Sequence, residues 1–341
     1  MKSNNKVKLN NTFAIGCLVQ WYEVEIFDEY FDSLCKTIER IENKENIIID
    51  ICFNTSQYLE KIDESQMKMK DIFKRFLEYR TKVTKLRPDY PILSDHNITY
   101  YEDDSKPYTI ADYRRDFNNK YCEKVDVLMW GETDSILPKQ TFEILDSLHS
   151  SVKETTPKYV SFFGMCKMWD NSWKPLEHPD FTDKPFIEND YDNWWSLKYT
   201  MSADEMYKIN EKVEELEIVT LNNFKFNGCG LVISSDVVKA GANIPKSVFF
   251  VHEDTAFQNS MIKLFDNAVP QYVIKNILLV HNRNHPDKRM YIKDERKDGT
   301  MNEKRRSNEW YSHANKACEH NAYNMFNQSK IFTWEDVFNE S

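Results

Sequence analysis

The first 130 residues alternate short apolar runs with amphipathic stretches, and this order constrains the fold more than any other feature of the chain. Residues 13–19 form a continuous apolar run of strand length, and residues 47–53 are expected to form the next buried strand because they are rich in β-branched residues. Between them, apolar residues recur at spacings of three and four, which is typical of one helix face: Phe27, Phe31, Leu34, Ile38 and Ile41. The alternation continues with a helix expected at 64–86, a strand at 98–101, a helix at 109–121 and a strand at 125–130. Strand–helix units in series predict a parallel sheet with helices on its faces.

The expected sheet indicates where a ligand would bind. Open parallel sheets bind ligands at the carboxyl ends of their strands, so we expect the site just after residues 19, 53, 101 and 130. The chain has only seven glycines, with neither a GxGxxG turn nor a GxxxxGK[ST] loop. Nicotinamide-dependent Rossmann enzymes and P-loop NTPases are therefore disfavoured.

The second half of the chain is less regular. Strands are expected at 158–164, 224–234 and 272–280, and a helix at 307–327. Ser202 and Glu205 form a capping-box pattern that predicts a helix from there to about residue 216. No Pro-, Gly- or Ser-rich linker divides the chain, so we expect one continuous body with the second half packed on the sheet edge.

The charge distribution is uneven. The net charge is −10, whereas a protein that binds polyanions over a wide surface is usually basic. Residues 67–87 nevertheless carry eight basic and two acidic side chains, and residues 283–306 carry nine and five. Each run fits either a solvated face or a phosphate-binding surface.

The cysteines and the hydropathy pattern bear on the compartment. Seven scattered cysteines without a CxxC pair predict reduced thiols and no cysteine-bound zinc. No apolar run approaches 18 residues, and residues 1–11 lack the apolar stretch of a signal peptide. We therefore expect a cytoplasmic protein with no membrane span.

Two carboxylates follow the strand expected at 125–130. Glu132 and Asp134 are two residues apart, and residues at that spacing share a face of a strand. Paired hard oxygen ligands suit Mg²⁺ or Mn²⁺. The alternative is a turn with acidic caps.

Two further groups could carry chemistry. Glu253 and Asp254 lie at the start of an expected helix, where they could complement the helix dipole or act as a general base. His281 leaves the strand at 272–280 and could be a metal ligand or an imidazole at the edge of the core.

The order of these features, with Asn227-Gly-Cys-Gly230 between them, resembles the GT-A glycosyltransferases, specifically the inverting family 2 type. The resemblance covers roughly residues 12–285. It implies an α/β fold with a mostly parallel, twisted sheet and helices on both faces, and an acceptor-side subregion toward the C-terminus. It divides the chain into a nucleotide-sugar half (12–150), an acceptor half (151–285) and a C-terminal helical extension (286–341).

The resemblance also implies residue roles on the donor side. Asp134, with Glu132 nearby, would bind Mn²⁺ or Mg²⁺ and the diphosphate of a nucleotide-sugar donor, and His281 would complete the metal ligands. Asp50 would contact the nucleobase or ribose, and Arg115 would lie near the nucleotide. The chain departs from the family in having Glu132 where an aspartate is usual, and in lacking an Asp-Gly-Ser turn after the second strand.

On the acceptor side, the resemblance makes Asp254 the base that deprotonates the acceptor hydroxyl, with Glu253 beside it. Aromatic residues are dense in 169–199, where Trp169, Trp194 and Trp195 could stack on a sugar ring or a nucleobase, or simply form core. A saccharide or glycoconjugate acceptor is the expected one.

Other functions stay open at this stage. If the protein is viral and acts in the host cytoplasm, 5-hydroxymethylcytosine in DNA would offer the required hydroxyl. A non-catalytic module that binds sugar nucleotides or nucleic acid would use the same residues. A nucleotidyltransferase is disfavoured, because residues 16–25 contain one glycine and no basic residue.

Overall fold

The computed structural model describes residues 6–24, 26–58, 69–86, 97–101, 105–165, 202–221, 228–266, 268–281 and 309–339. Its strands are β1 (Phe13–Gln20), β2 (Ile47–Asn54), β3 (Asn97–Tyr101), β4 (Val127–Trp130), β5 (Ser135–Ile136), β6 (Val160–Met165), β7 (Ile218–Leu221), β8 (Val232–Ser234) and β9 (Gln271–His281). Its α-helices are α1 (Phe27–Glu39), α2 (Met69–Leu86), α3 (Ile110–Tyr121), α4 (Thr141–Val152), α6 (Ala203–Asn210), α7 (Ser235–Lys239), α8 (Glu253–Phe265), α10 (Glu309–Asn324) and α11 (Trp334–Asn339). Short 3₁₀ turns occupy Trp21–Glu23 and Lys44–Asn46.

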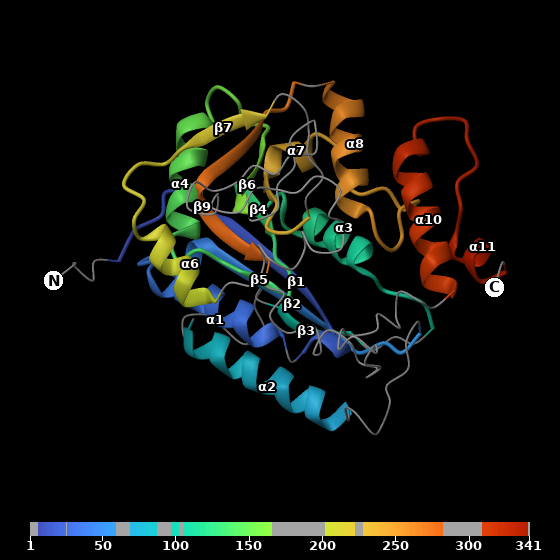
Figure 1. Cartoon of the computed structure of the whole chain (residues 1–341), viewed down its shortest axis with the longest axis horizontal. Coiled ribbons are helices and arrows are strands. Elements are labelled where there is room, and N and C mark those ends of the chain that lie inside the picture. The colour runs from blue at the N-terminus through green and yellow to red at the C-terminus, as the bar shows by residue number, and fades with distance from the viewer. Residues whose placement is uncertain are drawn as a thin grey trace, which may run out of the picture.

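The strands form one mixed sheet in the order β3-β2-β1-β4-β8-β6-β9-β5, with β7 paired to β9 (Figure 1). The block β3-β2-β1-β4 is parallel throughout, with Phe13 opposite both Ile47 and Val127. This confirms the parallel sheet predicted from the first half of the chain. The unbroken apolar runs match strands that are buried on both faces.

The other side of the sheet is mixed. β8 runs antiparallel to both β4 and β6, while β5 and β7 run antiparallel to β9. The helix expected to reach residue 216 ends at Asn210, whose side-chain amide donates to Leu278 O and accepts from Leu278 N. Because this pair of bonds attaches the helix end to β9, the chain leaves the helix early and forms β7.

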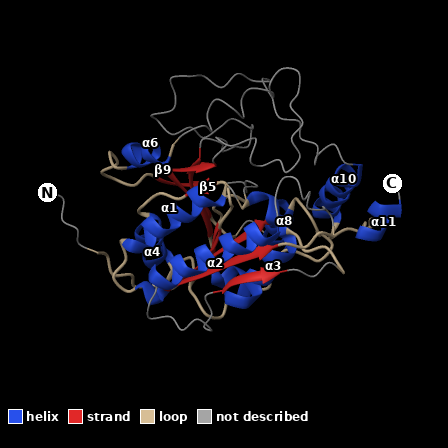
Figure 2. Cartoon of the chain, turned by 90° about the horizontal axis from the view of Figure 1, so that it is seen from below, coloured by secondary structure: helices blue, strands red, loops and turns tan. Residues whose placement is uncertain are grey.

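Helices cover both faces of the parallel block (Figures 1 and 2). Alternate side chains of a strand point to opposite faces, and β1 follows this rule. The ring of Phe13 packs on Phe142 of α4 at 5.6 Å, whereas a Cβ at Gly16 would collide with Phe117 of α3. The predicted α/β fold with helices on both faces is therefore confirmed.

The C-terminal helices join the same hydrophobic core. Ala314, Cys318 and Ala322 on α10 are buried with the core of the sheet, and Asn259 of α8 donates to Ala322 O at 2.9 Å. Residues 309–339 of the expected extension are thus part of the folded body.

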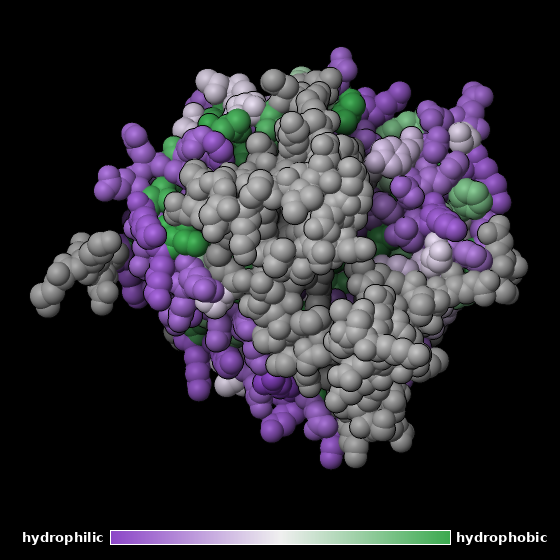
Figure 3. Space-filling model, in the orientation of Figure 1, coloured by the Kyte–Doolittle hydropathy of each residue, from purple (hydrophilic) through white to green (hydrophobic). Residues whose placement is uncertain are grey.

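On the face seen in Figure 3, the described residues are mostly hydrophilic, and hydrophobic residues appear as small separate patches. Among the described residues, no helix combines the length and the apolar character needed to cross a bilayer. Six cysteines lie in the described residues, with no disulfide between any two of them: Cys17, Cys35, Cys52, Cys122, Cys229 and Cys318.

Candidate active site

A cavity of about 240 Å³ opens at the carboxyl ends of the four parallel strands. Its described lining comes from the segments that follow β1, β2, β3 and β4, together with the start of α8 and of α10: Leu18, Gln20, Trp21, Glu23, Asn54, Ser56, Tyr58, Pro107, Tyr108, Thr109, Ile110, Gly131, Glu132, Thr133, Asp134, Phe250, Val251, Glu253 and Trp310. The position predicted from the strand order is confirmed.

The charge of this cavity is entirely negative over its described lining. Glu23, Glu132, Asp134 and Glu253 contribute carboxylates, and no lysine, arginine or histidine of the described residues lines it. Like charges this close repel one another and any anionic ligand. A cation held by these carboxylates would favour binding of a phosphate-bearing ligand.

Arg114 of α3 lies behind the cavity and joins two of these carboxylates. Its side chain is 2% exposed, donates from Nη2 to Glu132 Oε1 at 2.7 Å, and forms an ion pair from Nη1 with Glu253. Nη2 also donates to Gly228 O, where any Cβ would collide with the guanidinium. Burial alone would lower the pKa of Arg114, but the two carboxylates outweigh burial and raise it, so the guanidinium stays charged.

Glu253 reaches the cavity because of the backbone that precedes it. His252 is the N-cap of α8 and has φ 63°, a left-handed conformation that side chains other than glycine rarely adopt. Burial raises the pKa of Glu253 to about 7, against the pull of Arg114 and with a smaller contribution from Asp254. A carboxyl with that pKa in a cavity is a candidate general base.

Asp254, the base expected from the sequence resemblance, lies beside Glu253 at the start of α8. Of the two neighbouring acids it is Glu253, not Asp254, that lines the described part of the cavity. Asp254 Oδ1 accepts from the backbone N–H of Thr255 at 2.7 Å, within the first turn of α8. Successive helix residues point about 100° apart, so only one of the two can face the strand ends.

Asp134 and His281 come together through the sheet. β5 begins at Ser135, directly after Asp134, and Ser135 is the register partner of His281 in β9. The backbone of His281 therefore lies beside the acidic motif, while its side chain is outside the described residues. The described side chains alone do not form a group of three or more metal ligands. Glu132 and Asp134 both line the cavity, and their carboxylates are the hard oxygen ligands that suit a divalent ion.

Two of the expected donor residues do not line the described cavity. Asp50 is buried and accepts hydrogen bonds from Tyr113 and Tyr121 and an ion pair from Lys120, all on α3. These contacts attach α3 to β2. The expectation that Asp50 contacts a nucleotide is thus at odds with its placement.

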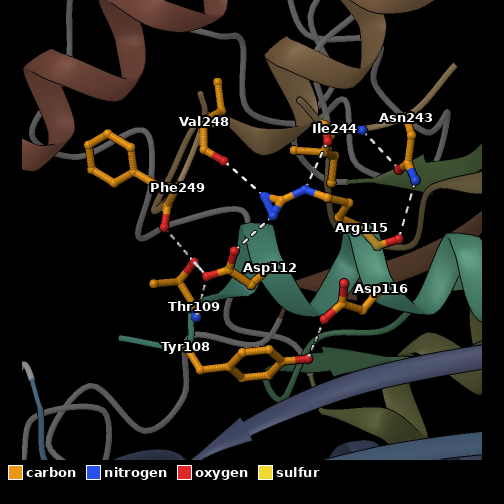
Figure 4. Close-up of polar contacts among 9 residues, drawn as sticks. All are labelled: Tyr108, Thr109, Asp112, Arg115, Asp116, Asn243, Ile244, Val248 and Phe249. Atoms are coloured by element: carbon orange, nitrogen blue, oxygen red, sulfur yellow. Dashed lines mark hydrogen bonds and ion pairs between the residues drawn. The ribbon is translucent and has the colours of Figure 1, made fainter. Parts of the chain in front are cut away.

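Arg115 likewise has a positioning role (Figure 4). It pairs with Asp112 at 2.8 Å and donates to the backbone oxygens of Ile244 and Val248. Thr109 Oγ1 donates to Phe249 O at 2.7 Å, so α3 fixes the segment that leads into Glu253. The residue of this pair that meets the acidic site is Arg114, which differs from the expectation for Arg115.

The sequence reasoning did not identify Arg114 or Trp310, and Trp169, Trp194 and Trp195 lie outside the described residues. Arg114 and Arg115 are adjacent in an amphipathic helix. The sequence pattern of that helix does not determine which of the two arginines faces the interior. Trp310 carries no sequence signal for a site, because it lies beyond the last motif.

Comparisons with known proteins found matches among solved structures only. No protein-family model matches the chain, and no curated protein matches it in sequence. Among solved structures, the chain is similar to S. aureus TarS 1-349, with 11% identity, a TM-score of 0.44, and coverage of 79% of this chain and 59% of that one. A second structure of TarS 1-349, in complex with UDP-GlcNAc, gives 11% identity, a TM-score of 0.42, and coverage of 79% and 57%.

A structure of GalNAc-T7 with UDP, GalNAc and Mn²⁺ gives 10% identity and a TM-score of 0.47, covering 97% of this chain and 54% of that one. The chain spans less than two thirds of each of these solved structures.

Proposed function

We propose that this chain is a metal-dependent glycosyltransferase that moves a sugar from a nucleoside-diphosphate donor to an acceptor hydroxyl with inversion. The observation that carries the proposal is the meeting of Glu132, Asp134 and Glu253 in one cavity at the carboxyl ends of four parallel strands. A saccharide or glycoconjugate is the acceptor.

Asp134, with Glu132 and His281, would hold Mn²⁺ or Mg²⁺ against the donor diphosphate. When bound, such a cation neutralises charge that develops on the leaving diphosphate. Arg114 supports this arrangement from behind, because it holds Glu132 and Glu253 in fixed positions without occupying the cavity. The nucleoside would lie toward the ends of β1, β2 and β3, where Gln20, Asn54 and Ser56 offer neutral polar groups.

Glu253 is the proposed base, in place of Asp254. Its carboxylate takes the proton of the acceptor hydroxyl as that oxygen bonds to the anomeric carbon of the donor sugar. The bond from that carbon to the diphosphate oxygen breaks, and its electron pair leaves with the diphosphate. Because the acceptor attacks from the face opposite the leaving group, the anomeric configuration inverts.

The test is turnover of UDP-, GDP-, ADP- and TDP-sugars in the presence of Mn²⁺, measured as release of the nucleoside diphosphate. Glu253→Gln, which keeps the shape of the side chain, should lower kcat by about 100-fold or more. Asp254→Asn is the matched control at the next position and should stay within about tenfold of the wild type.

Two results would contradict the proposal. Absence of turnover and of binding for every donor would leave only a non-catalytic module. Loss of turnover in Asp254→Asn, with Glu253→Gln still active, would transfer the role of base to Asp254.

A further inference from the structure

The C-terminal helices supply an aromatic wall to the cavity. Trp310 of α10 and Phe250 both line it, and their ring centroids are 5.6 Å apart. Trp334 of α11 stands behind them, 5.9 Å from Phe250 and 6.5 Å from Trp310, without lining the described cavity. Phe338 of α11 meets Tyr58, another lining residue, at 6.2 Å.

This wall is held in place by polar contacts. Asn321 of α10 donates to Ser247 O at 2.7 Å, three residues before Phe250. From the other side, Thr109 and Arg115 of the α3 region bind the carbonyls of Phe249 and Val248 (Figure 4). Since α3 and α10 hold the same segment, the aromatic rings are pre-positioned and need little ordering when a ligand binds.

The aromatic wall lies in the same cavity as Glu253, the residue proposed to activate the acceptor hydroxyl. Phe250 lies three residues before Glu253, the proposed base, and both line the same cavity. A molecule that stacks on Trp310 would therefore share one cavity with Glu253. The aromatic face binds flat, apolar surfaces, while the surrounding polar groups bind hydroxyls.

The charged residues that line the cavity indicate whether the acceptor is anionic or neutral. Four carboxylates stand in its described lining, and such groups repel a second anion brought in beside the donor diphosphate. A polyanionic acceptor such as DNA would meet that repulsion, and a neutral pyranose ring would not. One face of such a ring carries C–H groups, and its rim carries hydroxyls.

We infer that Trp310, with Phe250, is the platform on which an uncharged saccharide acceptor stacks, so that α10 sets acceptor specificity. This inference rests on the proposed glycosyl transfer. It goes beyond it by restricting the saccharide acceptor to an uncharged one and by naming a specificity residue outside the part of the chain that carries the acidic motifs.

The experiment measures ligand binding directly on the full chain, with Mn²⁺ and UDP saturating the donor side. Neutral methyl glycosides of glucose, galactose and N-acetylglucosamine are screened by saturation-transfer difference NMR, beside a short single-stranded oligonucleotide containing 5-hydroxymethylcytosine. Trp310→Ala should weaken binding of the selected glycoside about tenfold, whereas Trp310→Phe, which keeps an aromatic face, should stay within about threefold. Trp334→Ala is the matched control, since it removes an equal ring from the same cluster but not from the lining, and it should keep the glycoside affinity.

The outcomes separate the two proposals. UDP binding without binding of any neutral glycoside overturns this inference and leaves the glycosyltransferase proposal standing. Equal glycoside affinity in Trp310→Ala and wild type, or preferential binding of the oligonucleotide, also overturns it. If UDP with Mn²⁺ does not bind to the wild type, the proposed function itself fails, and this inference fails with it.

Discussion

Arg114 is the residue on which the geometry of the acidic site depends most directly. Its guanidinium is buried and joins Glu132, from the segment after β4, to Glu253, at the start of α8. The carboxylates would repel each other without it. The two halves of the site therefore share one cation.

We predict that Arg114→Met lowers the free energy of unfolding by about 3–5 kcal/mol, because it leaves two carboxylates uncompensated. Glu132→Gln removes part of that repulsion, so the double variant should be more stable than the sum of the two single effects by about 0.5–3 kcal/mol. Urea unfolding of the four proteins measures this cycle, and strictly additive effects would contradict the shared-cation geometry.

Glu253 leads to a prediction for pH. Its pKa is raised to about 7, so below that pH the proposed base is protonated. We expect kcat/KM to fall about tenfold per pH unit below 7 and to level off above it. A profile that is flat from about pH 5.5 to 8.5, in protein shown by circular dichroism to stay folded, would rule out Glu253 as the base.

The raised pKa of Glu253 also makes the free energy of unfolding depend on pH. Because the pKa of Glu253 is raised above its ordinary value of 4.5, the folded protein binds this proton more tightly than the unfolded chain does. The contribution of this group to stability is therefore full below about pH 4.5 and is lost as the pH rises through about 7. Glu253→Gln should lack this part of the pH dependence.

At the scale of elements, the start of α8 determines which acid faces the cavity. His252 adopts a left-handed backbone conformation in the turn that leads into the helix. Such a conformation costs energy for any residue with a Cβ, and it is tolerated where the surrounding structure fixes it. Here the fixed surroundings are the segment 244–250, held by α3 and α10.

We predict that His252→Gly is neutral or stabilising, since glycine adopts this conformation without strain. His252→Val should cost about 1–3 kcal/mol, because a β-branched residue is least tolerant of positive φ. Thermal unfolding of the two variants measures the difference, and equal melting temperatures would contradict the strained turn.

At the scale of the whole molecule, the cavity combines segments from the two halves of the chain with the C-terminal helices. Because its described lining is acidic, we expect the anionic donor to bind more tightly when a divalent cation is bound beside it. A ligand at 100 times its Kd stabilises the folded state by about 2.7 kcal/mol, so UDP with Mn²⁺ should raise the melting temperature more than either alone.

Asp134→Asn should abolish this joint rise, because it removes a carboxylate from the cavity itself. Asp50→Asn is the control: it should lower the melting temperature by weakening the bonds between β2 and α3, but keep the rise on adding UDP with Mn²⁺. Loss of the response in Asp50→Asn would restore the expectation that Asp50 contacts the donor.

The sequence by itself determined the order of strands and helices in the parallel block, the edge at which the cavity lies, and the presence of Glu132 and Asp134 there. These follow from local patterns, since an apolar run and the residues directly after it are neighbours in the chain. The tertiary structure decided the choice between adjacent residues, Arg114 over Arg115 and Glu253 over Asp254, because packing sets the rotation of a helix about its axis. It also brought Trp310 to the cavity, through contacts between segments far apart in sequence that no local pattern encodes.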